Sequence, residues 1–270
     1  MLASVHRLAT AFTLVLLLTG LACKEKKGAD MDSDPFVEQT QAALPVPNPV
    51  QVHPVSHASA VLRWDGRTVY MDPVGHVALY SAYPAPDLIV VTDIHGDHFS
   101  PETLEALGNE GTEIIVPEAV FAQMRNALAE RATVLANDSV LTAAGITVTA
   151  IPMYNLREEA RDFHIKGRGN GYVLERDGYR VYISGDTEDI PEMRALRDID
   201  MAFVCMNLPY TMTVDRAADA VLEFRPARVY PYHYRGNPDV SDVAEFRSRV
   251  EAGGGSVQVV QMDWYPDAPY

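Results

Sequence analysis

The sequence V-V-T-D-I-H-G-D-H-F, residues 90–99, places two carboxylates and two imidazoles within six positions, directly after an apolar run. Ser100-Pro101-Glu102 then has the features of a helix start: a capping serine, a proline at the first helical position and an acid. The cluster is therefore predicted to lie between a strand and a helix. Buried ionisable groups are costly without partners, so these groups are solvated, salt-bridged or bound to a cation. A metal suits the donor set best, with candidate ligands Asp93, His95, Asp97 and His98.

The spacing within this stretch suggests how the four side chains converge. If the strand stays extended through His95, the side chains of Asp93 and His95 point the same way, because side chains repeat every two residues. Gly96 then permits a sharp bend that returns Asp97 and His98 toward the same point.

The rest of the chain predicts an alternation of strands and helices. Asp65-Gly66 and Asp177-Gly178 separate β-rich runs and indicate two hairpins, 59–71 and 171–184. Apolar runs predict further strands at 88–92, 113–116, 146–151, 201–205, 228–232 and 257–261. Helical spacing is found at 101–107, 118–131, 190–196, 214–224 and 240–251. Strand-rich runs followed by alternating elements occur twice, within 50–151 and 171–261, which predicts two sheets, each faced by helices.

The N-terminal region is predicted to be processed. His6 and Arg7 precede an apolar run, 8–18, and Gly20-Leu21-Ala22 lead into Cys23, the layout of a secretory signal. Cys23 resembles the lipidated cysteine of bacterial lipoproteins, although Gly20 stands where that motif usually has leucine. An ordinary cleaved signal and an uncleaved anchor are the alternatives. We therefore expect a signal peptide, 1–22, a lipidated tether, 23–49, and one domain, 50–270, exported and facing the periplasm or cell exterior.

Composition limits the partners. The chain has 22 Lys+Arg against 37 Asp+Glu, a formal net charge of -15, which argues against nucleic acid, because basic patches hold phosphate backbones. With Cys23 lipidated, Cys205 remains alone in an apolar run and is predicted to be a buried hydrophobic residue rather than half of a disulfide. A small-molecule or lipid-like substrate and a membrane anchor are the expected partners.

Four motifs together resemble the metallo-β-lactamase superfamily. D-I-H-G-D-H, 93–98, is similar to its H-x-H-x-D-H signature, I-S-G-D-T, 183–187, to its G-D-T turn, and Y-P-Y-H-Y, 230–234, to its last ligand strand. Upstream, V-S-H-A-S, 55–59, with V-Y-M-D-P, 69–73, resembles the branch that contains ascorbate-6-phosphate lactonase. The resemblance implies an α/β, four-layer αββα sandwich of two sheets flanked by helices, and a metal-dependent hydrolase.

The resemblance also implies a ligand set. Asp97, His98 and His233 correspond to ligands of one metal, Asp186 to the bridge, and Asp93 and His95 to ligands of the other metal. The chain departs from the family where Asp93 replaces a histidine and where Ile151–Asn155 contains none, so His164 is a candidate substitute. Either two divalent metals bind, with oxygen ligands favouring manganese or iron over zinc at the altered site, or one metal binds.

The expected mechanism is attack by a metal-bound hydroxide on a carbonyl carbon or phosphorus, cleaving a phosphodiester, ester or lactone. Asp97 is the candidate proton acceptor, and His57 lies near the metals by resemblance. Asp72 either holds a histidine or forms a turn. Ser59, Ser184 and Cys205 have no evident base partner, which disfavours a nucleophilic triad. The candidate substrate contacts are Tyr154, Asn155, Lys166, Arg168, Tyr234 and Arg235.

Two other functions compete with hydrolysis. The departures at Asp93 and at Tyr154-Asn155 fit a binding protein on the same fold that has lost catalysis. A purely structural lipoprotein requires the D-I-H-G-D-H and G-D-T motifs to be coincidental. Metal content combined with turnover separates the enzyme from the binder.

Overall fold

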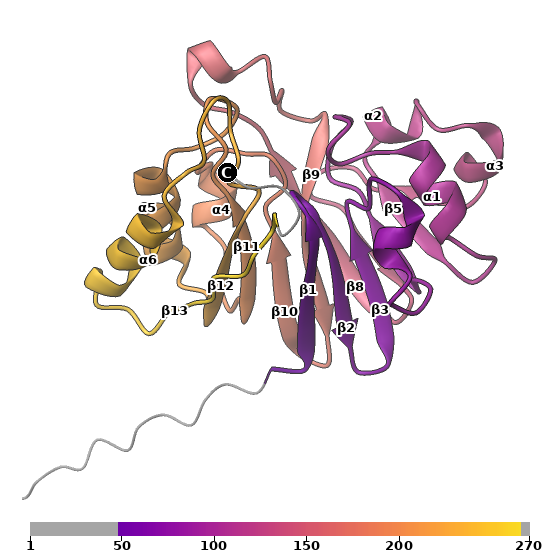
Figure 1. Ribbon diagram of the computed structural model, residues 1–270, viewed down its shortest axis with the longest axis horizontal. Helices are drawn as coiled ribbons and strands as arrows, with labels where there is room; N and C mark the ends of the chain where they lie inside the picture. Colours follow the sequence, from indigo (N-terminus) through magenta and orange to yellow (C-terminus); the bar gives the residue numbers. More distant parts are fainter. Residues whose placement is uncertain (1–47, 266–270) are drawn as a thin grey trace, which may run out of the picture. The chain divides into compact units, whose positions relative to one another are not determined.

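The computed structural model describes residues 48–265. The expected signal peptide, Cys23 and the tether up to residue 47 lie outside the described residues. Within the described range, no helix combines the length and the apolar character that crossing a membrane requires. Two β-sheets with helices on their outer faces form the described part of the chain, as predicted (Figure 1).

The first sheet contains six strands in chain order: β1 (Val50–Ser56), β2 (Ser59–Trp64), β3 (Arg67–Met71), β4 (Leu88–Val90), β5 (Glu113–Val116) and β6 (Ala132–Val134). Its first three strands are antiparallel, and the pairs from β3 to β6 are parallel. The sequence prediction missed β1. This strand contains Pro54, which lacks a backbone donor, and an edge position tolerates that loss.

The second sheet repeats this plan with seven strands: β7 (Val140–Ala143), β8 (Ile146–Met153), β9 (Gly169–Arg176), β10 (Tyr179–Ile183), β11 (Met201–Cys205), β12 (Arg228–Tyr232) and β13 (Gln258–Val259). Strands β7 to β10 are antiparallel, and β10 to β13 are parallel. Both predicted Asp-Gly hairpins are confirmed. Their turn residues have positive φ, with 44° and 81° at Asp65-Gly66 and 51° and 79° at Asp177-Gly178.

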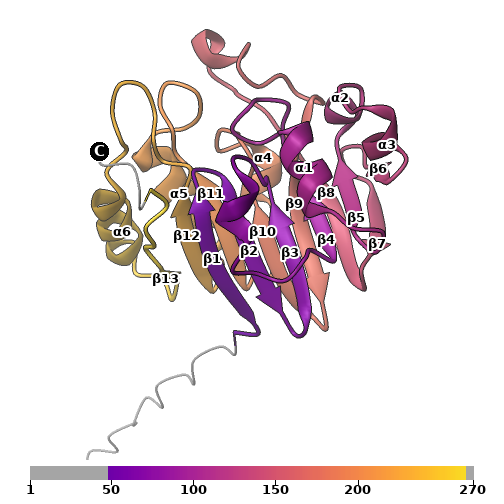
Figure 2. The ribbon, with the colours of Figure 1, turned by 45° about the vertical axis from the view of Figure 1, so that its right-hand side comes forward.

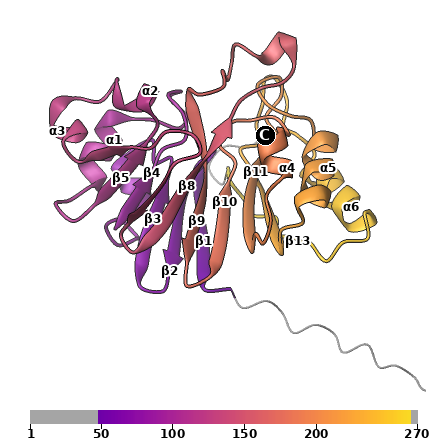
Figure 3. The same ribbon diagram turned by 180° about the vertical axis from the view of Figure 1, so that it is seen from behind.

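Helices cover the outer face of each sheet (Figures 1 and 3). The first sheet carries α1 (Pro101–Leu107), α2 (Glu118–Phe121) and α3 (Asn126–Ala129), and the second carries α4 (Pro191–Arg194), α5 (Val214–Phe224) and α6 (Val243–Ala252). The single helix predicted over 118–131 is wrong. Gln123 and Met124 donate to carbonyls three residues back, which tightens the chain into a turn between α2 and α3.

Two buried clusters hold the layers together. Alternation along β2 sends Leu62 into the core between the sheets, with Leu174 and Phe203, and Val61 into the core beneath α1 and α3. Cys205 is fully buried in the inter-sheet core, as predicted, and burial raises the pKa of its thiol to about 12. The turned view in Figure 2 shows the two sheets face to face, and loops that follow strands of both sheets supply the residues discussed next.

Candidate metal centre

The polar residues of the centre follow the ends of strands. His57 comes directly after β1, Asp72 after β3 and His233 after β12, each with a left-handed backbone at φ values of 56°, 43° and 46°. Few non-glycine residues adopt this conformation, although Asp and His do so more readily than most, and such residues cluster at functional sites. Asp186 follows β10 through Gly185, which has a φ of 60°. The strand ends of both sheets therefore aim these side chains at one region.

The turn after β4 supplies four more residues, by a route different from the one predicted. The strand ends at Val90, so alternation along an extended strand does not reach His95. Instead, the amides of His98 and Phe99 both donate to the His95 carbonyl. Gly96 has no positive φ and has open space around its Cα, so the bend does not require glycine.

One ligand group consists of His98, Asp186 and His233, all buried. Asp186 Oδ1 lies 3.5 Å from His98 Nε2 and 3.2 Å from His233 Nε2. The two imidazole Nε2 atoms face each other at 3.1 Å. Asp97 borders the same group, with Oδ2 3.4 Å from His233 Nε2 and Oδ1 3.9 Å from His98 Nε2.

A second ligand group consists of Asp93, His95 and His164. Asp93 Oδ2 lies 2.7 Å from His95 Nδ1 and 3.9 Å from His164 Nε2. Asp186 links the two groups, because its Oδ2 lies 3.3 Å from His164 Nε2 while its Oδ1 faces the first group. His164 occupies the place for which the sequence offers no histidine in Ile151–Asn155.

These residues fit bound cations. Two ligand atoms about 2.1 Å from a tetrahedral cation are roughly 3.4 Å apart, which is close to the separations within the first group. Asp186 Oδ1 and His164 Nε2 are buried without a hydrogen-bond partner in the described structure. Buried polar atoms are normally satisfied, so such orphaned atoms need an explanation. A cation in the first group would satisfy Asp186 Oδ1, and one in the second group would satisfy His164 Nε2.

Two imidazoles, those of His98 and His164, are oriented by hydrogen bonds to Nδ1, the ring nitrogen that does not face the ligand group. His98 Nδ1 lies 2.8 Å from Asp72 Oδ2, and the Thr92 amide and hydroxyl donate to the same carboxylate at 2.7 and 2.6 Å. His164 Nδ1 lies 3.2 Å from the Tyr210 carbonyl. In both rings this arrangement directs Nε2 toward the ligand group, as in metal sites whose histidines are held by outer partners. Asp72 therefore supports a histidine, the first of the two roles considered for it.

The charged groups of the first ligand group stabilise one another. Burial disfavours the charged forms, but the imidazoles hold the pKa of Asp186 well below its ordinary value. Against the same desolvation, the Asp186 carboxylate raises the pKa of His98 and His233. Burial also opposes ionisation of Asp97, yet hydrogen bonds from His233 and His57 lower its pKa. Desolvation lowers the pKa of His57 itself, although Asp97 lies 3.3 Å away.

These shifts predict that metal binding releases protons. An imidazole must lose its proton to bind a cation, and the raised pKa values keep His98 and His233 more protonated near neutral pH than free histidine. Affinity should therefore increase as pH rises above about 6.5, by up to about tenfold per pH unit for each proton released. Calorimetric titration with zinc in buffers of different ionisation enthalpy measures the release. Equal heats in all buffers would contradict it.

Arg168 makes the two ligand groups unequal. Its guanidinium forms a bidentate pair with Asp93, at 3.1 Å from Nε to Oδ1 and 3.0 Å from Nη2 to Oδ2. The side chain of Asp93 is fully buried, so this pair is poorly screened by solvent. A cation in the second group has to share Asp93 with Arg168, whereas no Lys or Arg contact to Asp186 is present among the described residues.

We therefore predict stepwise metal binding. The group around His98 should bind the first equivalent, and the group around Asp93 the second, at least about tenfold more weakly. In Arg168→Met, loss of the competing charge should narrow this difference, as calorimetry with manganese or zinc would measure. Arg180→Met, which removes a half-buried arginine of β10 that pairs with Glu175 away from the ligand groups, is the control. A wild-type protein that fills both groups in a single step contradicts the prediction.

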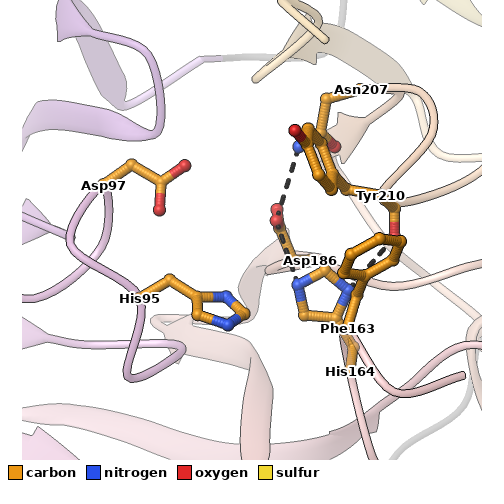
Figure 4. Close-up of a pocket in the computed structure, with 7 residues that line it drawn as sticks. All are labelled: His95, Asp97, Phe163, His164, Asp186, Asn207 and Tyr210. Carbon is orange, nitrogen blue, oxygen red and sulfur yellow. Dashed lines mark hydrogen bonds and ion pairs between the residues drawn. The ribbon is translucent and has the colours of Figure 1, made fainter. Parts of the chain in front are cut away.

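A cavity of about 200 Å³ opens over these groups (Figure 4). Its lining residues are His95, Asp97, Phe163, His164, Asp186, Asn207 and Tyr210. Sequence reasoning missed Phe163, Asn207 and Tyr210, which belong to the loops before β9 and after β11. The Asn207 amide is oriented, because the Thr211 hydroxyl donates to its Oδ1 at 2.6 Å, leaving Nδ2 3.4 Å from Asp186 Oδ2.

The predicted substrate contacts lie outside this lining. Asn155 Nδ2 donates to the Tyr210 carbonyl at 2.6 Å, and the Tyr154 hydroxyl and the Lys166 ammonium both bond to Glu192. Arg235 stacks over the Tyr265 ring, and Tyr265 also contacts Tyr234 and His57. The positions of these residues do not support direct contact with a substrate. Asn155 instead lies next to the Nδ1 atom of His164, where it can hold that ring in place.

Comparisons with known proteins agree with this architecture. Residues 51–233 match the family model of the β-lactamase superfamily domain. A crystal structure of a protein from Parabacteroides distasonis named as a metal-dependent hydrolase is 36% identical, with a TM-score of 0.70, covering 79% of this chain and 94% of that one. A UPF0173 metal-dependent hydrolase from Thermus thermophilus is 29% identical over 215 residues, 76% of this chain and 93% of the relative. One from Thermococcus onnurineus is 29% identical over 173 residues, 61% and 74% of the two chains.

Proposed function

Because the chain belongs to the metallo-β-lactamase superfamily and is a metal-dependent hydrolase, we propose that it directs water at a carbonyl carbon or phosphorus and cleaves an ester, lactone or phosphodiester bond. The observation that carries the proposal is the Asp186 carboxylate, whose two oxygens face different histidine groups. The V-S-H-A-S and M-D-P motifs favour the lactonase-like branch. The mixed nitrogen and oxygen ligands suit zinc, manganese or iron.

Several side chains of the protein have separate roles in this reaction. Divalent cations held by the two groups would polarise the substrate oxygen and make water acidic near neutral pH. Asp97, with a lowered pKa and about 40% of its side chain exposed, borders the cavity as a carboxylate that can orient water and accept a proton. His57 and His233 hold that carboxylate from two sides. Asn207 Nδ2 offers a buried donor for a developing oxyanion.

Metal analysis followed by turnover tests the function. The purified protein is stripped, reloaded with zinc or manganese, and assayed on bis(p-nitrophenyl) phosphate, phenyl acetate and δ-valerolactone. Hydrolysis of at least one substrate that disappears on chelation and returns with metal supports the proposal. Two bound equivalents without turnover on any of the three substrates favour the non-catalytic binding protein.

We also propose that the protein is exported and held at a membrane through lipidated Cys23, facing the periplasm or cell exterior. The support is the sequence of residues 6–23. In the wild type, labelled palmitate should be incorporated and the protein should sediment with membranes. Cys23→Ala should lose both properties. A variant that still takes up label and still sediments with membranes would overturn the anchor.

A further inference from the structure

The cavity over the ligand groups offers no positive side chain to a substrate. Of its seven lining residues in the described chain, none is Lys or Arg, and two, Asp97 and Asp186, are carboxylates (Figure 4). Phosphate groups are normally held by Arg or Lys through charge-assisted hydrogen bonds. Bound cations would bring positive charge, which Asp97 and Asp186 would partly offset, while Asp93 is already paired with Arg168. The side chains that line the cavity therefore add no attraction for an anion beyond that of the cations.

The basic side chains on the bordering loop are already engaged. In the β8–β9 loop, 154–168, Arg168 is paired with Asp93, and Arg157 with the buried carboxylate of Glu188. Lys166 Nζ lies 2.6 Å from Glu192 and 4.6 Å from the centroid of the Tyr154 ring. Arg161 of the same loop is exposed and does not line the cavity. Freeing any of these three cations would remove the Arg or Lys partner of a carboxylate.

Long-range charge acts in the same direction. The chain has a formal net charge of -15, so an anionic substrate approaches against the field of the whole protein. A hydrolase for phosphate esters gains from a positive field, which concentrates its substrate. The negative field of the protein does not affect the approach of an uncharged substrate, and it repels a carboxylate product.

The remaining wall of the cavity is aromatic. Phe163 and Tyr210 come from different loops and meet edge to face, with ring centroids 5.1 Å apart. The same two loops also carry the exposed apolar residues Leu156, Ile165 and Leu208, with exposed fractions of 39%, 53% and 38%. An apolar cavity of about 150 Å³ admits a benzene ring. The volume of about 200 Å³ here suits a phenyl ring or a short alkyl chain together with its carbonyl group.

From these features we infer that the site takes an uncharged carboxylic ester or lactone whose aryl or short alkyl group packs against Phe163 and Tyr210, and that it discriminates against phosphate esters. This inference rests on the proposed hydrolase function. Water adds its oxygen to the acyl carbon, the bond from that carbon to the alkoxy oxygen breaks, and the alkoxy oxygen receives a proton. An ester gives a carboxylic acid and an alcohol, and a lactone gives one hydroxy acid, with no change in oxidation state.

A pair of substrates that differ by one charge tests the inferred preference for an uncharged substrate. Phenyl acetate and 4-acetoxybenzoate contain the same aryl acetate bond, and only the second carries a carboxylate. With the protein loaded with manganese or zinc, kcat/KM should be at least about tenfold higher for phenyl acetate, corresponding to about 1.4 kcal/mol. It should also exceed the value for bis(p-nitrophenyl) phosphate. Raising the salt concentration should reduce the preference between the two acetates, because part of it is long-range.

A variant of Phe163 tests the inferred contact between the substrate and the aromatic wall of the cavity. Phe163→Ala should lower kcat/KM for phenyl acetate by about 3- to 10-fold, since an aromatic contact contributes about 0.5–1.5 kcal/mol. The value for methyl acetate should change little. Phe163 is 36% exposed, so the variant should fold. Leu79→Ala removes a comparable exposed apolar side chain, 43% exposed and not among the cavity residues, and should leave both substrates unchanged.

The outcomes separate this inference from the proposed function. A higher kcat/KM on the phosphodiester than on phenyl acetate, or equal values for the two acetates, overturns the substrate class and leaves the hydrolase assignment standing. Equal losses on phenyl and methyl acetate in Phe163→Ala overturn the ring contact. No hydrolysis of any substrate by the metal-loaded protein overturns the proposed function, and the inference with it.

Discussion

Replacing Asp186 with asparagine is expected to lower kcat/KM by about a thousandfold and to reduce the bound metal to one equivalent or fewer. Asp186 is the only carboxylate in the described chain whose oxygens lie within 3.5 Å of histidines from both ligand groups, His164 on one side and His98 and His233 on the other. Losing a shared ligand removes several kcal/mol of stabilisation of the developing negative charge, and about 1.4 kcal/mol corresponds to a tenfold change.

A matched control lies three residues along the same loop. Asp189 is also buried, but it pairs with Arg194 and Arg216 and with no residue of the ligand groups. Asp189→Asn should reduce the thermal stability and leave metal content and kcat nearly unchanged. Metal content is measured by elemental analysis and kcat/KM on the best substrate of the wild type. An Asp186→Asn protein that retains two equivalents and more than roughly a tenth of the activity would show that Asp186 does not bridge the groups.

Local sequence predicted the plan of two helix-covered sheets, whereas the roles of the residues at the strand ends came from the family resemblance. The hairpins at Asp65-Gly66 and Asp177-Gly178 follow from residues that accept positive φ, and the burial of β11 and β12 follows from continuous apolar runs. The G-D-T turn indicated Asp186 through its resemblance to the family motif, and the structure adds that Gly185 has a left-handed backbone there. These features are determined within a few residues, which is the range over which a sequence pattern can be interpreted.

The walls of the cavity could not be predicted in the same way. Their positions depend on contacts between two loops far apart in the sequence. Arg157 donates from one loop to the carbonyls of Pro209 and Thr211 in the other, and Asn155 donates to the carbonyl of Tyr210. No local pattern encodes these bonds. The same contacts bring His164 to Asp186, so the histidine that the sequence lacked at Ile151–Asn155 comes from the loop that these contacts hold in place.

Arg168, predicted from the sequence to be a substrate contact, also makes its main contact with a residue far away in the sequence. An arginine next to Gly167 and Gly169 looks available from the sequence, because nothing nearby in the chain pairs with it. In the structure its partner is Asp93, 75 residues away. Asp93, which stands where the family has histidine, and Arg168 therefore form one ion pair. The sequence gives no sign that the two residues are connected.

Replacing Asn207 with alanine is expected to lower kcat by about 10²- to 10³-fold with a smaller change in KM. The Thr211 hydroxyl fixes the amide so that Nδ2 points into the cavity beside Asp186 (Figure 4). A fixed donor strengthens its hydrogen bond as charge develops on the substrate oxygen, and removing one such donor costs about 2.7–4 kcal/mol in enzymes that depend on it. Single-turnover and steady-state rates on phenyl acetate at saturating metal measure the effect.

Asn207 could instead act only by positioning Asp186, and metal titration separates the two roles. A positioning residue changes metal affinity by about 10- to 100-fold, and saturating metal then restores kcat. A donor to the oxyanion leaves metal affinity nearly unchanged, and no metal concentration restores kcat. Thr211→Val, which keeps the amide but removes the hydroxyl that orients it, should give an intermediate loss of about tenfold. Recovery of kcat by metal in Asn207→Ala would assign Asn207 to the support of Asp186 alone.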